Sequence, residues 1–387
     1  MKFPWMPAIA ALLCAGSADA APCSDLADPV YVSSGSVSQP VLRALSPVLA
    51  AGTGADHMTL VYVFTQTCDT LLRFTSGAAL TGTGVTYAAD GTATSCDVPE
   101  GTHADLGIGN LFAPSCVSVS PTVDPSVVSD APYVVSPTVF VVPVASDQVA
   151  ISAEEAYFVY GFGAAGMVMP WTDEHFIYRR TATAGTQVVI AQNINVPAAR
   201  FLGIDGVSVQ NLLTLVAAAP TPRTAVGFLS AADADAHRSA VRRLAFRAYG
   251  QQSFYWPDST HASFDRRNVR DGHYQVWNYE HVYVPVAAPA DGRARRLGDM
   301  LTGVRPLPTG DMTSVAIGLG FVPRCAMSVQ RTADDDGTSI ASYDPPAPCG
   351  CSFEAAVPMG TTTCHACTTV ADCGGTGACR RGYCEAR

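Results

Sequence analysis

Three stretches of the sequence share one local form: an apolar strand, a short run of small hydroxyl or glycine residues, and a helix start. They cover residues 33–40, 65–69 and 180–187. The first backbone N–H groups of a helix lack intrahelical partners and lie at the positive end of its dipole. Three such ends meeting in a cleft, with hydroxyls and Arg180 beside them, would bind an anion. Taken singly, each stretch is an ordinary cap and turn.

The elements that would position these turns alternate between strands and helices. Runs of β-branched and aromatic residues predict strands at 30–32, 58–64, 138–144 and 282–286. Helical spacing of apolar residues predicts a helix over 39–51, with Pro40 at its first position, and one over 153–162 capped by Ser152. Further helices are expected at 187–194, 207–218 and 232–245. This order predicts an α/β fold with a largely parallel sheet.

Five short motifs follow one another along these elements. They are Ser38-Gln39-Pro40, Thr67-Cys68-Asp69, Asp105–Asn110 (DLGIGN), Arg180–Thr186 (RTATAGT) and Asp271–Tyr274 (DGHY). Their order over residues 28–300 resembles that of the phosphate-binding subunit of phosphate ABC transporters, within the type 2 periplasmic binding proteins. That family has Thr-Phe-Pro, Ser-Ser-Gly-Gly, Asp-Phe-Gly-Ala-Ser-Asp and Arg-x-Asp-x-Ser-Gly-Thr in the first four places, and Asp-Gly-x-Tyr before a late strand.

The resemblance implies two α/β lobes joined by hinge strands, with a small oxyanion, phosphate or similar, held between them. Lobe 1 would comprise about residues 28–116 and 250–305, and lobe 2 about 117–249. A transporter permease would be the partner, and no cofactor or metal is expected. The residues expected to hold the ligand are Ser36, Ser38, Thr67, Asn110, Arg180, Gly185 and Thr186.

The sequence departs from the family motifs at three positions. Asn110 stands where the family has a cleft aspartate, and Ala182 and Ala184 replace the Asp and Ser of the arginine motif. Losing the acceptor should weaken discrimination of phosphate from sulfate-like anions, and losing a hydroxyl donor would cost about 1–3 kcal/mol. We expect Arg180 between the lobes, near the Ser36–Ser38 turn and Asn110. Either an external anion pairs with it, or another acid such as Asp105 compensates.

The N-terminus has the order of a secretory signal peptide over residues 1–20. Lys2 precedes the apolar stretch Met6–Ala15, and Ala18-Asp19-Ala20 is a small-x-small cleavage site. Cys14 follows a bulky Leu where a lipobox wants a small residue, so lipidation is not expected. The pattern predicts export to the periplasm or the extracellular space, and no later apolar run approaches the length of a membrane span.

Cysteine usage agrees with export, because thirteen cysteines less Cys14 leave twelve. Of the four early ones, Cys68 and Cys96 fall at ends of predicted elements and are the expected pair; Cys23 with Cys116 follows by elimination. A loop of this length would stabilise by about 3–4 kcal/mol. The other eight lie at 325–384, with seven of them in residues 349–387.

The chain after about Pro306 is expected to fold as a separate extension ending in a Cys-rich module over 349–387. Met327–Gln330 and Thr338–Tyr343 predict a hairpin around the acidic run 334–336. That run lacks the alternate spacing of a calcium loop, so a solvated turn is favoured. One CxxC pair without a second pair or a partner His at finger spacing favours disulfides over zinc.

Composition and missing motifs argue against several classes of function. The net charge of −10 argues against nucleic acid and acidic membrane surfaces. Lys2 is the only lysine, which excludes a P-loop and Schiff-base chemistry, and the sequence has no G-x-S-x-G, H-E-x-x-H or S-x-x-K motif. A non-enzymatic oxyanion receptor is therefore the leading hypothesis. A scaffold that has lost its ligand and acts through surface or protein contacts is the second, and a secreted hydrolase is a distant third.

Overall fold

The computed structural model describes residues 20–375 and 377–386. The predicted signal peptide, including Lys2 and Cys14, therefore lies almost wholly outside the described residues. Within the described ranges, no helix has the length and apolar character that crossing a membrane requires.

A mixed sheet extends through both halves of the molecule, in the order β10-β6-β13-β5-β1-β2-β3-β4. Its parallel part consists of β1 (Pro29–Ser34), β2 (Thr59–Phe64) and β5 (Leu106–Gly109). Helix α1 (Gln39–Ala50) connects β1 to β2, and α2 (Thr67–Ser76) follows β2. The hairpin of β3 (Thr83–Tyr87) and β4 (Ala93–Asp97) extends one edge. These elements, with β13 and α8 (Arg293–Leu301), form the half that we call lobe 1.

The predicted start of α1 is confirmed, and its cause is visible in the core. Pro40 lies in the first turn of the helix, where a missing N–H costs nothing. Val41, Leu42, Leu45 and Leu49 recur at helical spacing and are all fully buried. Burial of this one face holds the helix against the sheet and so fixes the turn at residues 35–38 that precedes it.

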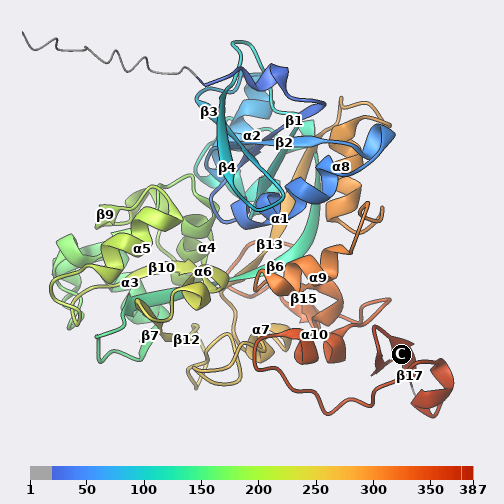
Figure 1. The fold of residues 1–387 in the computed structure, drawn as a ribbon. Helices are drawn as coiled ribbons and strands as arrows, with labels where there is room; N and C mark the ends of the chain where they lie inside the picture. Colours follow the sequence, from blue (N-terminus) through green and yellow to red (C-terminus); the bar gives the residue numbers. More distant parts are fainter. Residues whose placement is uncertain (1–19, 376, 387) are drawn as a thin grey trace, which may run out of the picture.

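Two long strands connect lobe 1 to the second half. Strand β6 (Val128–Pro143) pairs antiparallel with β13 (Trp277–Pro285) through its first part, and with β10 (Gly227–Ser230) and β11 (Val241–Arg243) through its last part. Figure 1 shows β6 running from the blue upper half into the green half. The register of β6 and β13 shifts between Glu280 and His281, which marks a β-bulge. Because most main-sheet pairings outside β1, β2 and β5 are antiparallel, the expectation of a largely parallel sheet is wrong.

The half that we call lobe 2 surrounds the far end of β6. Its helices are α3 (Ala153–Phe162), α4 (Gly185–Ile194), α5 (Val209–Ala217) and α6 (Ala231–Ala236). It also holds β8 (Tyr178–Arg179) with β9 (Ile204–Asp205), and β7 (Ala150–Ser152) with β12 (Ala245–Arg247). The predicted cap of α3 is a complete capping box between Ser152 and Glu155. The residue boundaries of the two lobes stay a prediction.

The helix predicted over 232–245 is wrong beyond Ala236. Residues Val241–Arg243 instead pair with Val141–Pro143 of β6. Val241 and Leu244 are fully buried. The open edge of β6 satisfies the backbone hydrogen-bonding groups of this segment, which a helix would otherwise satisfy internally. A long-range sheet edge therefore overrides the local helical pattern.

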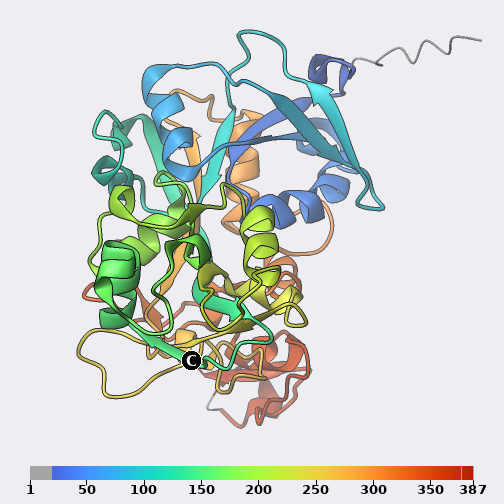
Figure 2. The same cartoon turned by 90° about the vertical axis from the view of Figure 1, so that its left-hand side faces the viewer.

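The segment after Pro306 is part of the main core, and the expectation of a separately folded extension is wrong. Strand β14 (Val322–Pro323) adds to β6. Phe321, Met327 and Phe353 are at most 2% exposed and belong to the same hydrophobic cluster as lobes 1 and 2. The Cys-rich end lies away from lobe 1 in both views (Figures 1 and 2).

The predicted hairpin is confirmed in β15 (Val329–Gln330) and β16 (Ala341–Ser342). Its acidic run is a turn only in part. Asp335 accepts the Gly337 amide at 2.9 Å, as in a local turn. Asp334 is instead 6% exposed and accepts from the Phe112 amide and the Ser115 hydroxyl, which ties the hairpin to lobe 1.

The described cysteines form six disulfides, but the predicted early pairing is wrong. The two early bonds are Cys23–Cys96 and Cys68–Cys116, and the other four lie near the C-terminus. An isolated bridge between Pro22 and Asp97 sets the N-terminal segment beside β4, and helix α2 lies against the 3-10 helix Ala113–Ser118. These two neighbour relations decide the partners, and neither is visible at the ends of single elements.

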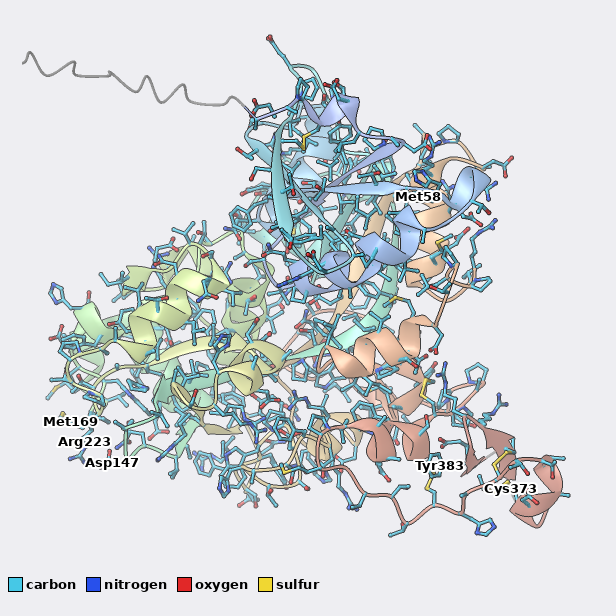
Figure 3. All side chains as sticks on the ribbon, viewed as in Figure 1. Met58, Asp147, Met169, Arg223, Cys373 and Tyr383 are labelled. Carbon is cyan, nitrogen blue, oxygen red and sulfur yellow. A yellow bond between two sulfur atoms is a disulfide. The ribbon has the colours of Figure 1, made fainter. Side chains whose placement is uncertain are left out.

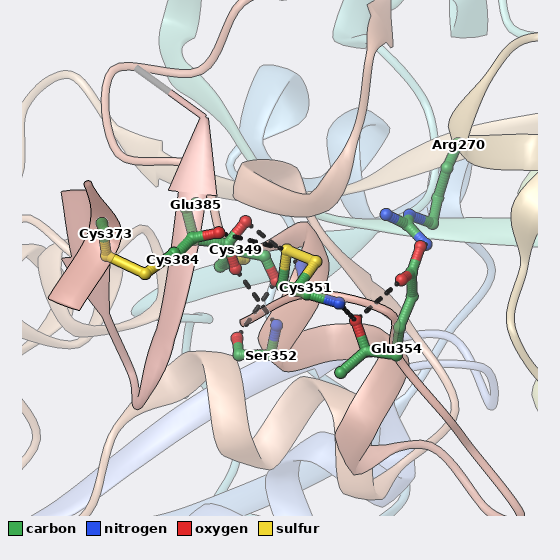
Figure 4. The surroundings of a disulfide bond; sticks show 10 residues. Arg270, Cys349, Cys351, Ser352, Glu354, Cys373, Cys384 and Glu385 are labelled. Carbon is green, nitrogen blue, oxygen red and sulfur yellow. Dashed lines mark hydrogen bonds and ion pairs between the residues drawn. A yellow bond between two sulfur atoms is a disulfide. The ribbon is translucent and has the colours of Figure 1, made fainter. Parts of the chain in front are cut away.

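The C-terminal bonds are Cys325–Cys349, Cys351–Cys364, Cys367–Cys379 and Cys373–Cys384. Sulfurs of three of these cysteines lie within 4.8 Å of one another, but disulfide bonding removes the thiolates that zinc would require. Glu385 accepts the amides of Cys351 and Ser352 at 3.1 Å, so it ties the final hairpin to the start of α10 (Gly350–Ala356; Figure 4).

Core membership of this segment predicts a large effect of Phe353→Ala. The Phe353 side chain is 1% exposed and lies 5.2 Å from the Arg270 guanidinium, so its loss should lower the free energy of unfolding by about 3–5 kcal/mol. Urea unfolding of the oxidised protein measures this. The control is Met359→Ala, at 80% exposed, which should change it by less than about 0.5 kcal/mol. Equal effects of the two substitutions would show that the segment is independent of the main core.

Candidate functional site

The polar turns of lobe 1 meet the start of helix α4 of lobe 2. Thr67 begins α2, Asn110 follows β5, and the Thr67 hydroxyl donates to Asn110 Oδ1 at 3.0 Å. Gly185 begins α4 and lies directly against this pair: a Cβ added there would sit 1.9 Å from Asn110 Oδ1. Of the predicted ligand residues, these three are therefore brought together, and only glycine at 185 permits the approach.

Backbone contacts close the lobes at the same place. The Cys68 amide, in the first turn of α2, donates to the Thr183 carbonyl at 3.1 Å. The Thr183 hydroxyl donates to Asp69 Oδ2 at 3.1 Å. One of the helix-end amides expected to face an anion therefore has a partner from the opposite lobe. Thr186, 3% exposed, is buried in the first turn of α4.

Arg180 follows β8 and reaches across to lobe 1. It is 2% exposed; its Nη2 donates to the Val207 carbonyl at 3.1 Å and lies 3.5 Å from the Ser36 hydroxyl. Its buried Nε has no hydrogen-bond partner in the described part of the chain. Among the described residues, no carboxylate oxygen lies within 4 Å of its guanidinium, and no hydrogen bond joins it to Asn110.

The charge on Arg180 is therefore only remotely balanced. Burial lowers the pKa of Arg180 to about 10, and the more distant Asp233, Asp205 and Tyr62 oppose this shift. Asp105, the acid expected to compensate, instead accepts the Tyr31 amide at 2.7 Å. The neighbouring Arg179 is different, because its Nη1 pairs with Asp205 at 3.0 Å.

A cleft of about 580 Å³ opens between the two lobes at the turn that contains Ser36. Its wall on the lobe 1 side includes Ser36, Gln39 and Tyr62, and its wall on the lobe 2 side includes Ser208 and Asp233. Arg180 does not itself line this cleft, but its Nη2 lies 3.5 Å from the hydroxyl of Ser36, which does.

The buried carboxyl group of Glu280 lies on the other side of the same turn. Ser38 donates its hydroxyl to Glu280 Oε2 at 2.7 Å, and the side chain of Glu280, on β13, is 0% exposed. Within the ranges that the structure describes, its second oxygen, Oε1, has no hydrogen-bond partner, and neither has the buried hydroxyl of Tyr133. Burial raises the pKa of Glu280 to about 7, while the hydrogen bond from Ser38, the neighbouring His281 and the side chain of Ser136 oppose the shift.

Sequence reasoning missed Glu280, although a signal was present. It is the one carboxylate in Trp277–Pro285, a strand otherwise rich in aromatic and apolar residues and buried along nearly its whole length. A lone acid in such a run is costly to bury without a role or a partner. The adjacent His281 is fully buried and lies 2.5 Å from Asp130 through its Nδ1.

No protein-family model matches this chain, and no curated protein matches it. Solved structures do resemble it. A Clostridium perfringens protein described as a phosphate ABC transporter substrate-binding protein, solved with bound phosphate, matches with a TM-score of 0.52 at 9% identity, over 76% of this chain and 99% of that one. The chain has the type 2 periplasmic-binding-protein fold. An ABC-type phosphate transport receptor from Vibrio cholerae also matches, with a TM-score of 0.46 at 14% identity, over 76% and 99% of the two chains.

The binding-protein fold agrees with the arrangement described above, in which strands β6 and β13 connect two α/β lobes. At such low identity the likeness concerns the fold alone. The roles of Ser36, Ser38, Thr67, Asn110, Arg180, Gly185 and Thr186 in ligand binding stay a prediction.

The close approach at Gly185 predicts that Gly185→Ala forces the lobes apart. The added methyl group would overlap Asn110 and Thr67, so we expect a loss of about 1–3 kcal/mol in unfolding free energy and a larger radius of gyration in small-angle scattering. The control is Gly318→Ala in α9 (Met312–Gly318), where an added Cβ meets no atom within 4 Å and stability should not fall. An unchanged radius and stability in Gly185→Ala would contradict the lobe contact.

Proposed function

We propose that this chain is an exported substrate-binding protein that holds a small oxyanion between its two lobes, without catalysing a reaction. Phosphate or a related tetrahedral anion is the proposed ligand, and an ABC transporter permease the proposed partner. Export rests on the signal-peptide pattern of residues 1–20 and agrees with the disulfide content of the chain.

The observation that carries the proposal is the unpaired charge of Arg180. Elsewhere in lobe 2 and its neighbouring loop, buried arginines have carboxylates beside them. Arg266 and Arg243, at most 5% exposed, both pair with Asp258 and Asp235. A lone buried guanidinium is costly, and an anion entering the adjacent cleft would supply the missing charge.

Arg331 is another buried arginine without a close carboxylate, but it has an aromatic partner. It is 3% exposed, and its guanidinium lies 4.2 Å from the centre of the Trp277 ring. Stacking on an aromatic face partly replaces an ion pair. Arg180 has neither an ion pair nor such a stacking partner among the described residues, which supports its proposed role as a ligand group.

The departures from the family motifs favour a less selective site. Asn110 carries no charge, and its amide oxygen already accepts from Thr67. Ala182 and Ala184 provide no hydroxyl or carboxyl groups. We therefore propose that the site accepts unprotonated anions such as sulfate alongside phosphate.

A ligand-free scaffold is the second candidate, favoured by the lobe-to-lobe hydrogen bond from the Cys68 amide to Thr183. In that function the closed lobes would be permanent, and the Cys-rich end would make surface or protein contacts. The two candidates differ in whether any oxyanion binds.

Isothermal titration calorimetry with phosphate, arsenate and sulfate tests the proposal. The wild-type protein should bind at least one of them, and Arg180→Ala should weaken that binding by about 10- to 150-fold, the value of hydrogen bonds to a charged group. The control is Arg223→Ala, on the outer side of lobe 2 near Asp147 (Figure 3), which should bind as the wild type does.

Thermal unfolding of both variants checks that each is folded. Binding by none of the anions would favour the scaffold. Unchanged binding in Arg180→Ala would remove Arg180 from the site.

A further inference from the structure

The Ser36–Ser38 turn has an ionisable group on each side. The Ser36 hydroxyl lies 3.5 Å from Arg180, and the Ser38 hydroxyl donates to Glu280 at 2.7 Å. Ser38 also precedes the first residue of α1, a helix of twelve residues, so the start of that helix lies beside both groups. One three-residue turn thus joins the cationic and the carboxyl parts of the interlobe region.

The bulge in the hinge strands contributes to this placement. Val134 is opposite Glu280 and Pro132 is opposite His281, so Tyr133 is the extra residue of β6. A bulge re-aims the side chains around it. Here it coincides with two buried polar atoms that lack partners, Glu280 Oε1 and the Tyr133 hydroxyl.

Glu280 has no ion-pair partner in the described part of the chain, although the adjacent His281 favours its ionised form. Among the described residues, no arginine or histidine nitrogen lies within 4 Å of its carboxylate. The neighbouring His281 is 2.5 Å from Asp130 of β6, and it also interacts with Asp334.

The other titratable groups that influence Glu280 are unfavourable to its charge. Asp233 of α6 adds a negative charge that favours the protonated form of Glu280, and it interacts with Arg180 as well. From β6, Tyr133 offers a neutral hydroxyl, because burial and Glu280 hold its pKa well above the usual range. These surroundings favour a neutral Glu280.

Protonation also changes what the free oxygen can do. An ionised carboxylate only accepts hydrogen bonds, whereas a protonated one has an O–H that donates. An oxyanion offers only acceptors where it is unprotonated, and a second negative charge beside it in a buried site is repulsive.

We propose that Glu280 is the proton-carrying group of the interlobe anion site: the oxyanion binds to the form in which Glu280 is protonated, and its free oxygen donates to the ligand. This inference rests on the proposed function. No bond is broken; a proton from solvent is held on Glu280 when the anion is bound.

The proposal predicts proton-linked affinity with a defined sign. Since only the protonated form binds, affinity is highest below about pH 7, the pKa of Glu280. Above it, affinity should fall about tenfold per pH unit, or about 30-fold between pH 6.0 and pH 8.5. Sulfate is the cleanest probe because it does not titrate in this range.

The experiment is calorimetry of sulfate and phosphate binding to the full oxidised chain from pH 6.0 to pH 8.5, in buffers of different protonation enthalpy. Wild type should show the fall in affinity and take up a proton on binding at pH 8. Glu280→Gln, which is neutral at every pH, should show a flat profile with sulfate and take up about one proton fewer with either anion. Glu154→Gln, at an exposed carboxylate, should match the wild type.

The outcomes separate the two proposals. No oxyanion binding by wild type at any pH overturns the proposed function and this inference together. Binding that is lost in Arg180→Ala but has the same pH profile and proton uptake in Glu280→Gln overturns the inference alone. If Glu280→Gln does not fold, infrared spectroscopy of the wild type decides. A protonated-carboxyl band that grows on adding anion at pH 8 supports the proposal, and its absence overturns it.

Discussion

The antiparallel pairing of β6 with β13 is the constraint on which the rest of the molecule depends. Strand β13 pairs with β5 of lobe 1 on one side and with β6 on the other, and β6 continues into lobe 2 to pair with β10 and β11. The lobes are therefore connected by strands whose backbone groups are bonded on both sides of the junction. Any opening of the cleft has to bend these strands, and the bulge at Glu280 and His281 is where their ladder is already irregular.

Much of this organisation was predictable because it depends on patterns within short stretches of sequence. The strand–turn–helix starts at Ser38, Thr67 and Gly185 lie where the motif order placed them, and the capping box at Ser152 is a short-range signal. The predictions that were wrong concern segments whose contacts are with residues distant in sequence. The cysteine pairing follows from which strand lies beside residue 22, and the fate of residues 241–243 follows from the free edge of β6. Neither neighbour is encoded within ten residues.

The same reason explains why the core role of the chain after Pro306 and the position of Glu280 were not predicted. The chain after Pro306 has a weak hydrophobic periodicity. Its core residues, such as Phe321 and Phe353, are single buried side chains in or beside short elements and do not form a continuous apolar face. Glu280 escaped notice because a single acid in an apolar strand has no spacing to recognise. Its meaning appears only when the fold sets Ser38, from 242 positions earlier in the chain, within hydrogen-bond distance.

The interlobe contacts fall into two kinds, and the difference bears on how a ligand would act. The bond from the Cys68 amide to Thr183, and the contact of Thr67 and Asn110 with Gly185, are neutral and complete within the protein. The groups on either side of the Ser36–Ser38 turn are not, because among the described residues Arg180 has no carboxylate within 4 Å and Glu280 Oε1 has no hydrogen-bond partner. Closure alone satisfies the first kind. An oxyanion accompanied by one proton would satisfy the second, since the anion pairs with Arg180 while Glu280 stays neutral and donates. A stable closed form and a ligand requirement are therefore compatible: the neutral contacts set the geometry, and in our proposal Arg180 and Glu280 set what that geometry would hold.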